Sequence, residues 1–193
     1  MFKSLSQIFG AVKNGYAYDT PFKGISLYEV LGTPALGTNT AVHAAVTLTG
    51  AAQTVTTGIT NPDAPRALLV KGNASGIVGT VTIYGRDVNG SAMSEKISLN
   101  GSSAVLGNAA FAVITKIVLP AKTNASGDTV SIGTSNKLGL MHPIIQDADV
   151  TLLLVDGVAE AAAAIDEVNS TITTTTALND TRRIDVVYIT KLI

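Results

Sequence analysis

The chain has 193 residues, no Cys and no Trp, and its 14% of charged residues compares with about 25% in an average soluble domain. The absence of Cys excludes disulfides, thiolate metal ligands and Cys nucleophiles. With 13 Lys and Arg against 14 Asp and Glu, the net charge of −1 argues against a nucleic-acid partner, because such binding draws on clustered cations.

A membrane partner is not expected either. No apolar run approaches the roughly 18 residues that cross a bilayer. A single-stranded nucleic acid is also not an expected partner. Basic residues such as Arg66, Lys71 and Arg86 are scattered, and they form no basic face with interleaved aromatic residues of the kind that binds single strands.

Residues 1–40 are predicted to form an extended N-terminal arm. Apolar residues near its start recur at helical spacing, which is compatible with a short amphipathic helix: Phe2, Leu5, Ile8, Phe9 and Val12. Residues 14–40 contain four Gly and two Pro, which interrupt regular elements. The same stretch carries Tyr16, Tyr18, Phe22 and Tyr28. We expect an irregular arm that anchors its aromatic residues on its own domain or on a neighbouring subunit.

Residues 41–193 are predicted to form one all-β domain. Apolar and polar residues alternate with a period of two, and turn residues recur every 8–14 residues. The Asn-Gly pairs at 89–90 and 100–101 indicate hairpins, because both residue types accept a positive φ. The pattern predicts an antiparallel β-sandwich or barrel of short strands. These strands are expected at residues 42–49, 53–57, 66–71, 79–88, 93–99, 111–119, 129–134, 149–155, 171–176 and 183–190.

Two segments near the C-terminus need separate comment. In residues 183–190 apolar side chains occupy both alternating faces, so we expect both faces of this strand to be covered. The Ala-rich residues 159–165 leave two interpretations open. Ala is the best helix former, but so short a segment does not sustain an independent helix, and a turn followed by a strand is the other interpretation.

No catalytic, cofactor-binding or metal-binding residue is predicted. His43 and His142 are far apart in the sequence and lack ligand or triad partners at helical or hairpin spacing. Asp147 and Asp149 alternate as calcium ligands do, but without the Gly and final Glu of an EF-hand. Other carboxylates cannot be arranged as a glycosidase pair: Glu95, Asp128, Asp156, Glu160, Asp166 and Glu167. Gly72, Gly76 and Gly79 indicate a hairpin loop rather than a phosphate cradle. We expect a protein that is not an enzyme and has no cofactor.

Several segments share a characteristic β texture: residues 61–66 (NPDAPR), 79–91 (GTVTIYGRDVNGS), 95–102 (EKISLNGS), 111–120 (FAVITKIVLP) and 127–133 (GDTVSIG), followed by 137–140 and 183–189. Together they resemble a β domain that is common in structural proteins of tailed-bacteriophage virions. The resemblance covers residues 59–140 well, residues 141–193 loosely and the N-terminal arm not at all. It carries no catalytic residues and therefore implies a role in the virion.

Within that group we expect a head decoration (cement) or minor capsid protein that stabilises the phage head through subunit contacts. Its partners would be the major capsid protein or other virion subunits, and its own copies in a homo-oligomer, with a trimer favoured. Its location would be the virion, after assembly in the host cytoplasm. The low charge agrees with this expectation, since interfaces deplete charged residues at their centre.

The alternative is a tail, fibre or adhesin β module that binds a receptor or a glycan. Glycan sites normally use exposed aromatic platforms. The absence of Trp and the scarcity of aromatic residues in the β region make this alternative the weaker one.

Overall fold

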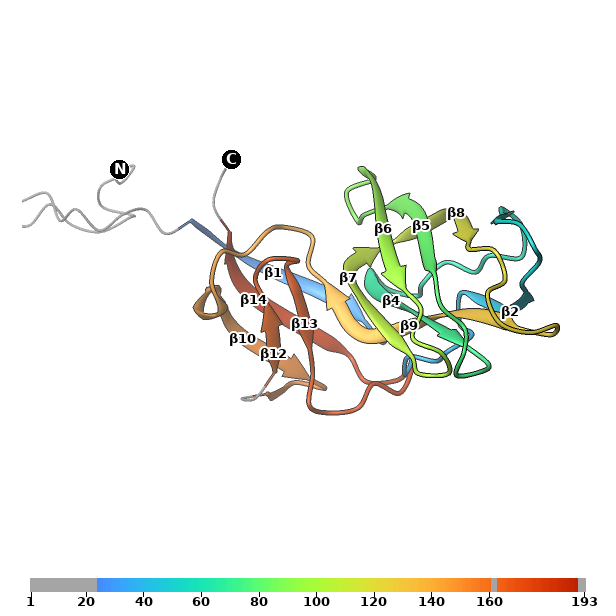
Figure 1. Ribbon diagram of the computed structural model, residues 1–193. Coiled ribbons are helices and arrows are strands. Elements are labelled where there is room, and N and C mark those ends of the chain that lie inside the picture. Colours follow the sequence, from blue (N-terminus) through green and yellow to red (C-terminus); the bar gives the residue numbers. More distant parts are fainter. Residues whose placement is uncertain (1–23, 161–162, 191–193) are drawn as a thin grey trace, which may run out of the picture.

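Residues 24–160 and 163–190 are described by a computed structural model, in which nearly all regular structure is antiparallel β (Figure 1). This confirms the predicted all-β class of sandwich or barrel. Among the described residues the only helical element is a 3₁₀ turn, η1 (Asp147–Asp149). The strands form three sheets.

The first sheet is formed by the two ends of the described chain. In order across the sheet it contains β1 (Ile25–Gly32), β14 (Ile184–Thr190), β10 (Val150–Val155) and β11 (Val158–Ala159). β1 pairs with β14 from Ile25 opposite Thr190 to Gly32 opposite Ile184. β1 is therefore an edge strand, with one side paired and the other not paired with any described strand.

The other two sheets curl around each other. The second contains β12 (Ala164–Asp166), β13 (Thr171–Thr173), β9 (Thr129–Gly139), β4 (Arg66–Gly72) and β7 (Val105–Phe111), with β2 (His43–Thr47) also paired to β9. The third contains β3 (Gln53–Val55), β8 (Val113–Leu119), β5 (Thr80–Arg86) and β6 (Ala92–Ser98). The chain passes from the second sheet to the third at Ala112, between β7 and β8.

Two hydrophobic cores hold these sheets together. The first lies between the second and third sheets, and its fully buried side chains include Leu68, Ile77, Ile83, Phe111, Ile117 and Ile132. The second lies between the first sheet and the far end of β9, and includes Leu138, Ile172, Ile184, Val186 and Tyr188. β9 supplies residues to both cores and runs between the two groups of strands (Figure 1).

Where a strand has one buried and one exposed face, the alternating sequence pattern correctly predicts which residues lie on each face. Val81 and Ile83 of β5 are fully buried, while Thr80 and Tyr84 are exposed. The Asn89-Gly90 pair does join a hairpin, β5 to β6. Only Gly90 takes a positive φ there, of 79°, so the turn is longer than the two-residue turn that the pair suggests.

The predicted arm needs one correction. Ile25–Gly32 forms a regular strand, β1, because its alternating side chains pack Leu27 and Leu31 against the second core. Residues 33–40 are irregular as predicted. The expected short helix, and the aromatic residues Tyr16, Tyr18 and Phe22, lie outside the described residues.

Two further segments differ from expectation. Residues 111–119 do not form one strand, because β7 ends at Phe111 and β8 begins at Val113. The Ala-rich region contains the short strands β11 and β12, so its described part follows the interpretation as turn and strand.

Candidate interaction surface

The first sheet presents an apolar face on its side away from the second core. Opposed residues of antiparallel strands share a face, and the register places Tyr28, Val187 and Leu152 in one row across β1, β14 and β10. We call this the outer face; it comprises Tyr28, Val30, Leu152, Leu154, Val187 and Ile189. Tyr28 is 59% exposed, Val30 48% and Leu152 40%.

The outer face corrects the expectation that both faces of the last strand are covered. On β14 the inner residues Ile184, Val186 and Tyr188 are fully buried. Val187 and Ile189, on the outer face, are only half-buried. The described part of the chain therefore covers one apolar face of this sheet and leaves the other accessible.

A polar cluster fixes the position of Tyr28 on the outer face. The Tyr28 hydroxyl donates to Asp185 Oδ1 at 2.8 Å, and Arg183 Nη2 donates to the same hydroxyl at 2.9 Å. Arg183 Nε also donates to Asp185 Oδ1 at 2.9 Å. The hydrogen bond with the Asp185 carboxylate raises the pKa of Arg183. This anchored aromatic ring is preorganised for contact, since its orientation is already set.

An apolar groove of about 450 Å³ runs beside the unpaired edge of β1. We call it the edge groove. One wall is β1 itself, residues 27–31, and the other is formed by residues 63–65, Val88 and residues 141–142. Tyr188 also lines the groove. The groove thus follows most of the length of β1.

Glu29 and Tyr188 connect the two walls of the edge groove. The Tyr188 hydroxyl donates to Glu29 Oε2 at 2.7 Å, and the backbone amide of His142 donates to that hydroxyl at 3.2 Å. The amide of Met141 donates to both oxygens of the Glu29 carboxylate. Burial, together with the hydrogen bond to Glu29, raises the pKa of Tyr188 above its ordinary value.

Removal of the Tyr188 hydroxyl should weaken the first sheet. We expect Tyr188→Phe to lower the free energy of unfolding by about 2 kcal/mol at neutral pH, because a buried donor to a carboxylate is lost. Burial makes the folded protein hold the phenol proton more tightly than the unfolded chain does. The contribution is therefore complete below pH of about 10 and is lost as the pH rises further.

Urea denaturation at a series of pH values measures this effect. The difference between wild type and Tyr188→Phe should narrow above pH of about 10. Tyr84→Phe is the matched control at neutral pH, since the described residues give the Tyr84 hydroxyl no hydrogen bond. A Tyr188→Phe variant as stable as wild type at neutral pH would contradict the role assigned to the hydroxyl.

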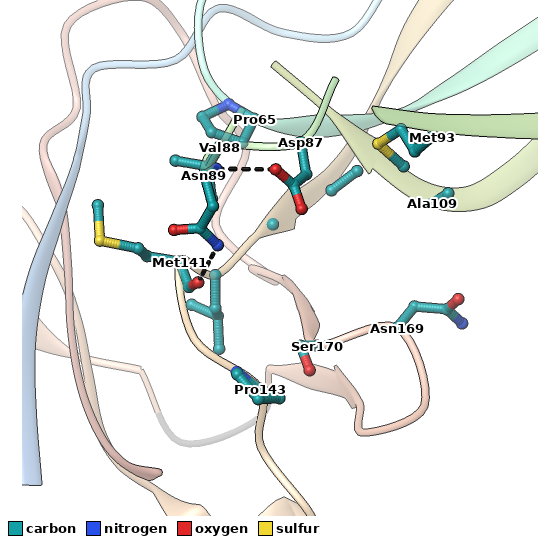
Figure 2. A pocket seen from close by; sticks show the side chains of 13 residues that line it. Pro65, Asp87, Val88, Asn89, Met93, Ala109, Met141, Pro143, Asn169 and Ser170 are labelled. Atoms are coloured by element: carbon teal, nitrogen blue, oxygen red, sulfur yellow. Dashed lines mark hydrogen bonds between the residues drawn. The ribbon is translucent and has the colours of Figure 1, made fainter. Parts of the chain in front are cut away.

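A second, smaller hollow of about 270 Å³ adjoins the edge groove and shares Pro65, Val88 and Met141 with it (Figure 2). Here the tip of the β5–β6 hairpin is held to the segment after β9, because Asn89 Nδ2 donates to the carbonyl of Met141 at 2.8 Å. Asp87 accepts from the amides of Asn89 and Ser91. The Asp87 carboxylate is thus occupied in its own turn.

Most of the acidic residues considered as candidates for chemistry accept hydrogen bonds within the fold. Asp149 accepts from the amides of Ile145 and Gln146, at 2.9 and 3.2 Å. Asp128, Asp156 and Glu160 likewise accept from backbone amides, those of Ala125, Arg183 and Thr175. Asp147 lies with Asp149 in η1. Asp166 accepts from Lys137 and Asn169.

The two histidines are not brought together. His43 lies on β2, whereas His142 lines the edge groove. Across residues 24–160 and 163–190, no three His, Asp or Glu side chains gather as a metal site requires. Gly72 ends β4, and Gly76 and Gly79 lie in the loop before β5. β4 and β5 belong to different sheets, so this loop connects sheets and is not a hairpin. No helix of the described chain is long and apolar enough to cross a membrane.

Sequence reasoning missed the outer face and the edge groove as sites. The signal for the outer face was present in residues 183–190, which are apolar on both faces. The edge groove is lined by residues that are distant in the sequence, so no local sequence pattern predicts it. The chain matches no protein-family model, no curated protein and no solved structure.

Proposed function

We propose that the chain is a structural protein of a tailed-phage virion, acting as a head decoration or minor capsid protein. The observation that carries this proposal is the outer face: an apolar, preorganised sheet surface that the described residues leave accessible. Exposed apolar patches of this kind mark interaction sites. The resemblance of residues 59–140 to a virion β domain supplies the setting.

The proposed mechanism is physical. Copies of the chain would bind the assembled shell, or one another in a trimer, through the outer face. Binding that favours the assembled state over its precursor stabilises that state by mass action. The low fraction of charged residues supports this proposal, because a surface covered by neighbours does not need a charged exterior.

Substitutions on the outer face test the proposal. We expect the double variant Val30→Lys/Leu152→Lys to reduce association with expanded phage heads, prepared without this protein, by at least about tenfold, because it places charge at an interface centre. Val78→Lys is the control, since Val78 is 52% exposed, close to the 48% of Val30, but lies outside the first sheet. Co-sedimentation measures head binding, and light scattering after size-exclusion chromatography measures oligomeric state.

The results separate the two candidate functions. A monomer that does not bind heads would overturn the proposal. Reproducible, saturable binding on a glycan array would instead favour the receptor-binding or adhesin module.

A further inference from the structure

β1 is an unusual edge strand. Natural sheets protect their edges with charge, Pro, short strands or covering groups, because an open edge pairs with other chains. β7 is protected by Glu95, whose Oε1 accepts from the amides of Asn108 and Ala109. β6 carries Glu95 and Lys96, and β3, β11 and β12 have only two or three residues.

β1 has fewer of these protections. It is eight residues long, contains no Lys or Pro, and has Glu29 as its single charged residue. Glu29 is already bound to Tyr188 and Met141. Within the described chain, the backbone of residues 25–31 makes strand pairs only with β14. The free side of β1 therefore offers unpaired backbone groups along the edge groove.

An extended peptide added to this edge would place alternate side chains into the groove. Such strand addition gains affinity from backbone hydrogen bonds and specificity from pockets for every second side chain. The groove needs an occupant with bulky apolar residues at a period of two.

One segment of this chain has that pattern and lies outside the described residues. In residues 16–22 (YAYDTPF) the aromatic residues Tyr16, Tyr18 and Phe22 all fall on one alternating face. Seven extended residues span about 23 Å, close to the length of β1. The one charged residue of this segment, Asp19, falls on the other alternating face, away from the aromatic residues. Pro21 is compatible with an edge position, where one side needs no donor.

The direction of the chain favours a segment from another copy. Gly24 lies next to the Ile25–Thr190 pair, and a Cβ atom there would lie 2.1 Å from the carbonyl oxygen of Thr190. Only Lys23 and Gly24 separate residue 22 from β1. A segment of the same copy would have to reverse direction immediately before β1 to reach the groove.

We infer that residues 16–22 of one copy add as a strand to the free edge of β1 in a second copy, with Tyr16, Tyr18 and Phe22 in the edge groove. The inference rests on the proposed function only in requiring that several copies assemble. It assigns the predicted arm a defined binding site. It also explains why a long, mostly apolar edge strand carries so little protection of its own.

Disulfide trapping in the full-length protein tests this inference, since the chain has no Cys of its own. Ala17 lies on the face opposite the aromatic residues, and Ser26 and Val30 lie on the outer face of β1. Ala17→Cys is mixed with a tagged Ser26→Cys or Val30→Cys variant, the two are refolded together, and mild oxidant is added. The control is Ser94→Cys, an exposed residue on the edge strand β6.

We expect a mixed disulfide dimer with Ser26→Cys or Val30→Cys, and only background with Ser94→Cys. The double variants Ala17→Cys/Ser26→Cys and Ala17→Cys/Val30→Cys should form the same link between chains. A link confined to single chains would overturn the assignment to a second copy, and background levels in every mixture would overturn the site. Cross-linking without head binding would overturn only the proposed function, and head binding without cross-linking only this inference.

Discussion

Arg66→Ala is expected to lower the free energy of unfolding by about 3–5 kcal/mol, the largest effect of any single substitution considered for this chain. Arg66 begins β4 at the junction of the two cores and is only 1% exposed. Its Nη2 donates to the carbonyl of Ala35 at 3.0 Å, and its Nη1 donates to Thr134 Oγ1 at 3.3 Å. Truncation removes both donors and leaves a cavity.

The charge of Arg66 has a partner as well. Arg66 Nε lies 3.4 Å from Asp63 Oδ1, an ion-pair distance, although Nε lacks the geometry of a hydrogen bond. Burial lowers the pKa of Arg66, and the Asp63 carboxylate opposes that shift. The pair is partly solvated, because the Asp63 carboxylate is 39% exposed. Truncation of Arg66 therefore costs mainly its two hydrogen-bond donors and the cavity that it leaves.

Two companion variants separate these contributions. Asp63→Asn should cost only about 1 kcal/mol, since this carboxylate is 39% exposed and solvent screens the pair. Lys96→Ala, on the exposed side of β6, should leave stability unchanged. Urea denaturation measures all three variants. A cost for Arg66→Ala no larger than that for Lys96→Ala would show that Arg66 does not join the two cores.

The β strands with one solvent-exposed face were predictable from the sequence. β5 and β6 alternate strictly, and the Asn89-Gly90 pair marks their connection, so local pattern and final structure agree. The same reasoning failed for β7. Its residues Gly107, Asn108, Ala109 and Ala110 have low strand propensity, and β7 is stabilised by pairing with β4 and by Glu95.

β1 shows a different reason for failure. Gly24, Gly32 and Pro34 indicate breaks, and they do flank the strand. The strand between them depends on β14, more than 150 residues later in the chain, and no local pattern reports that pairing. The edge groove has the same origin, since its walls come from four separate parts of the chain. Arg66, one of several scattered basic residues in the sequence, gains its role only when Ala35 and Thr134 surround it.

Gly133→Ala is the second substitution with a large expected effect. Gly133 lies in the middle of β9, where residues 37–39 cross the strand in direct backbone contact. A Cβ atom at Gly133 would lie 1.9 Å from the carbonyl oxygen of Thr38, the same oxygen that accepts from the amide of Thr134 at 3.0 Å. Gly37 has the reciprocal constraint, with a Cβ atom 2.4 Å from the carbonyl oxygen of Thr134.

The backbone of residues 37–39 cannot move aside as the end of a flexible side chain can. In Gly133→Ala this crossing segment would therefore have to separate from β9. We expect a cost of about 3 kcal/mol, at the upper end of the range for overpacked sites. Gly50→Ala is the control: its Cβ would meet nothing within 4 Å, and it should be neutral or gain about 0.5 kcal/mol. Because residues 33–40 join β1 to β2, separation at Gly133 should also increase hydrogen exchange in β1. Unchanged stability and exchange in Gly133→Ala would contradict the close crossing.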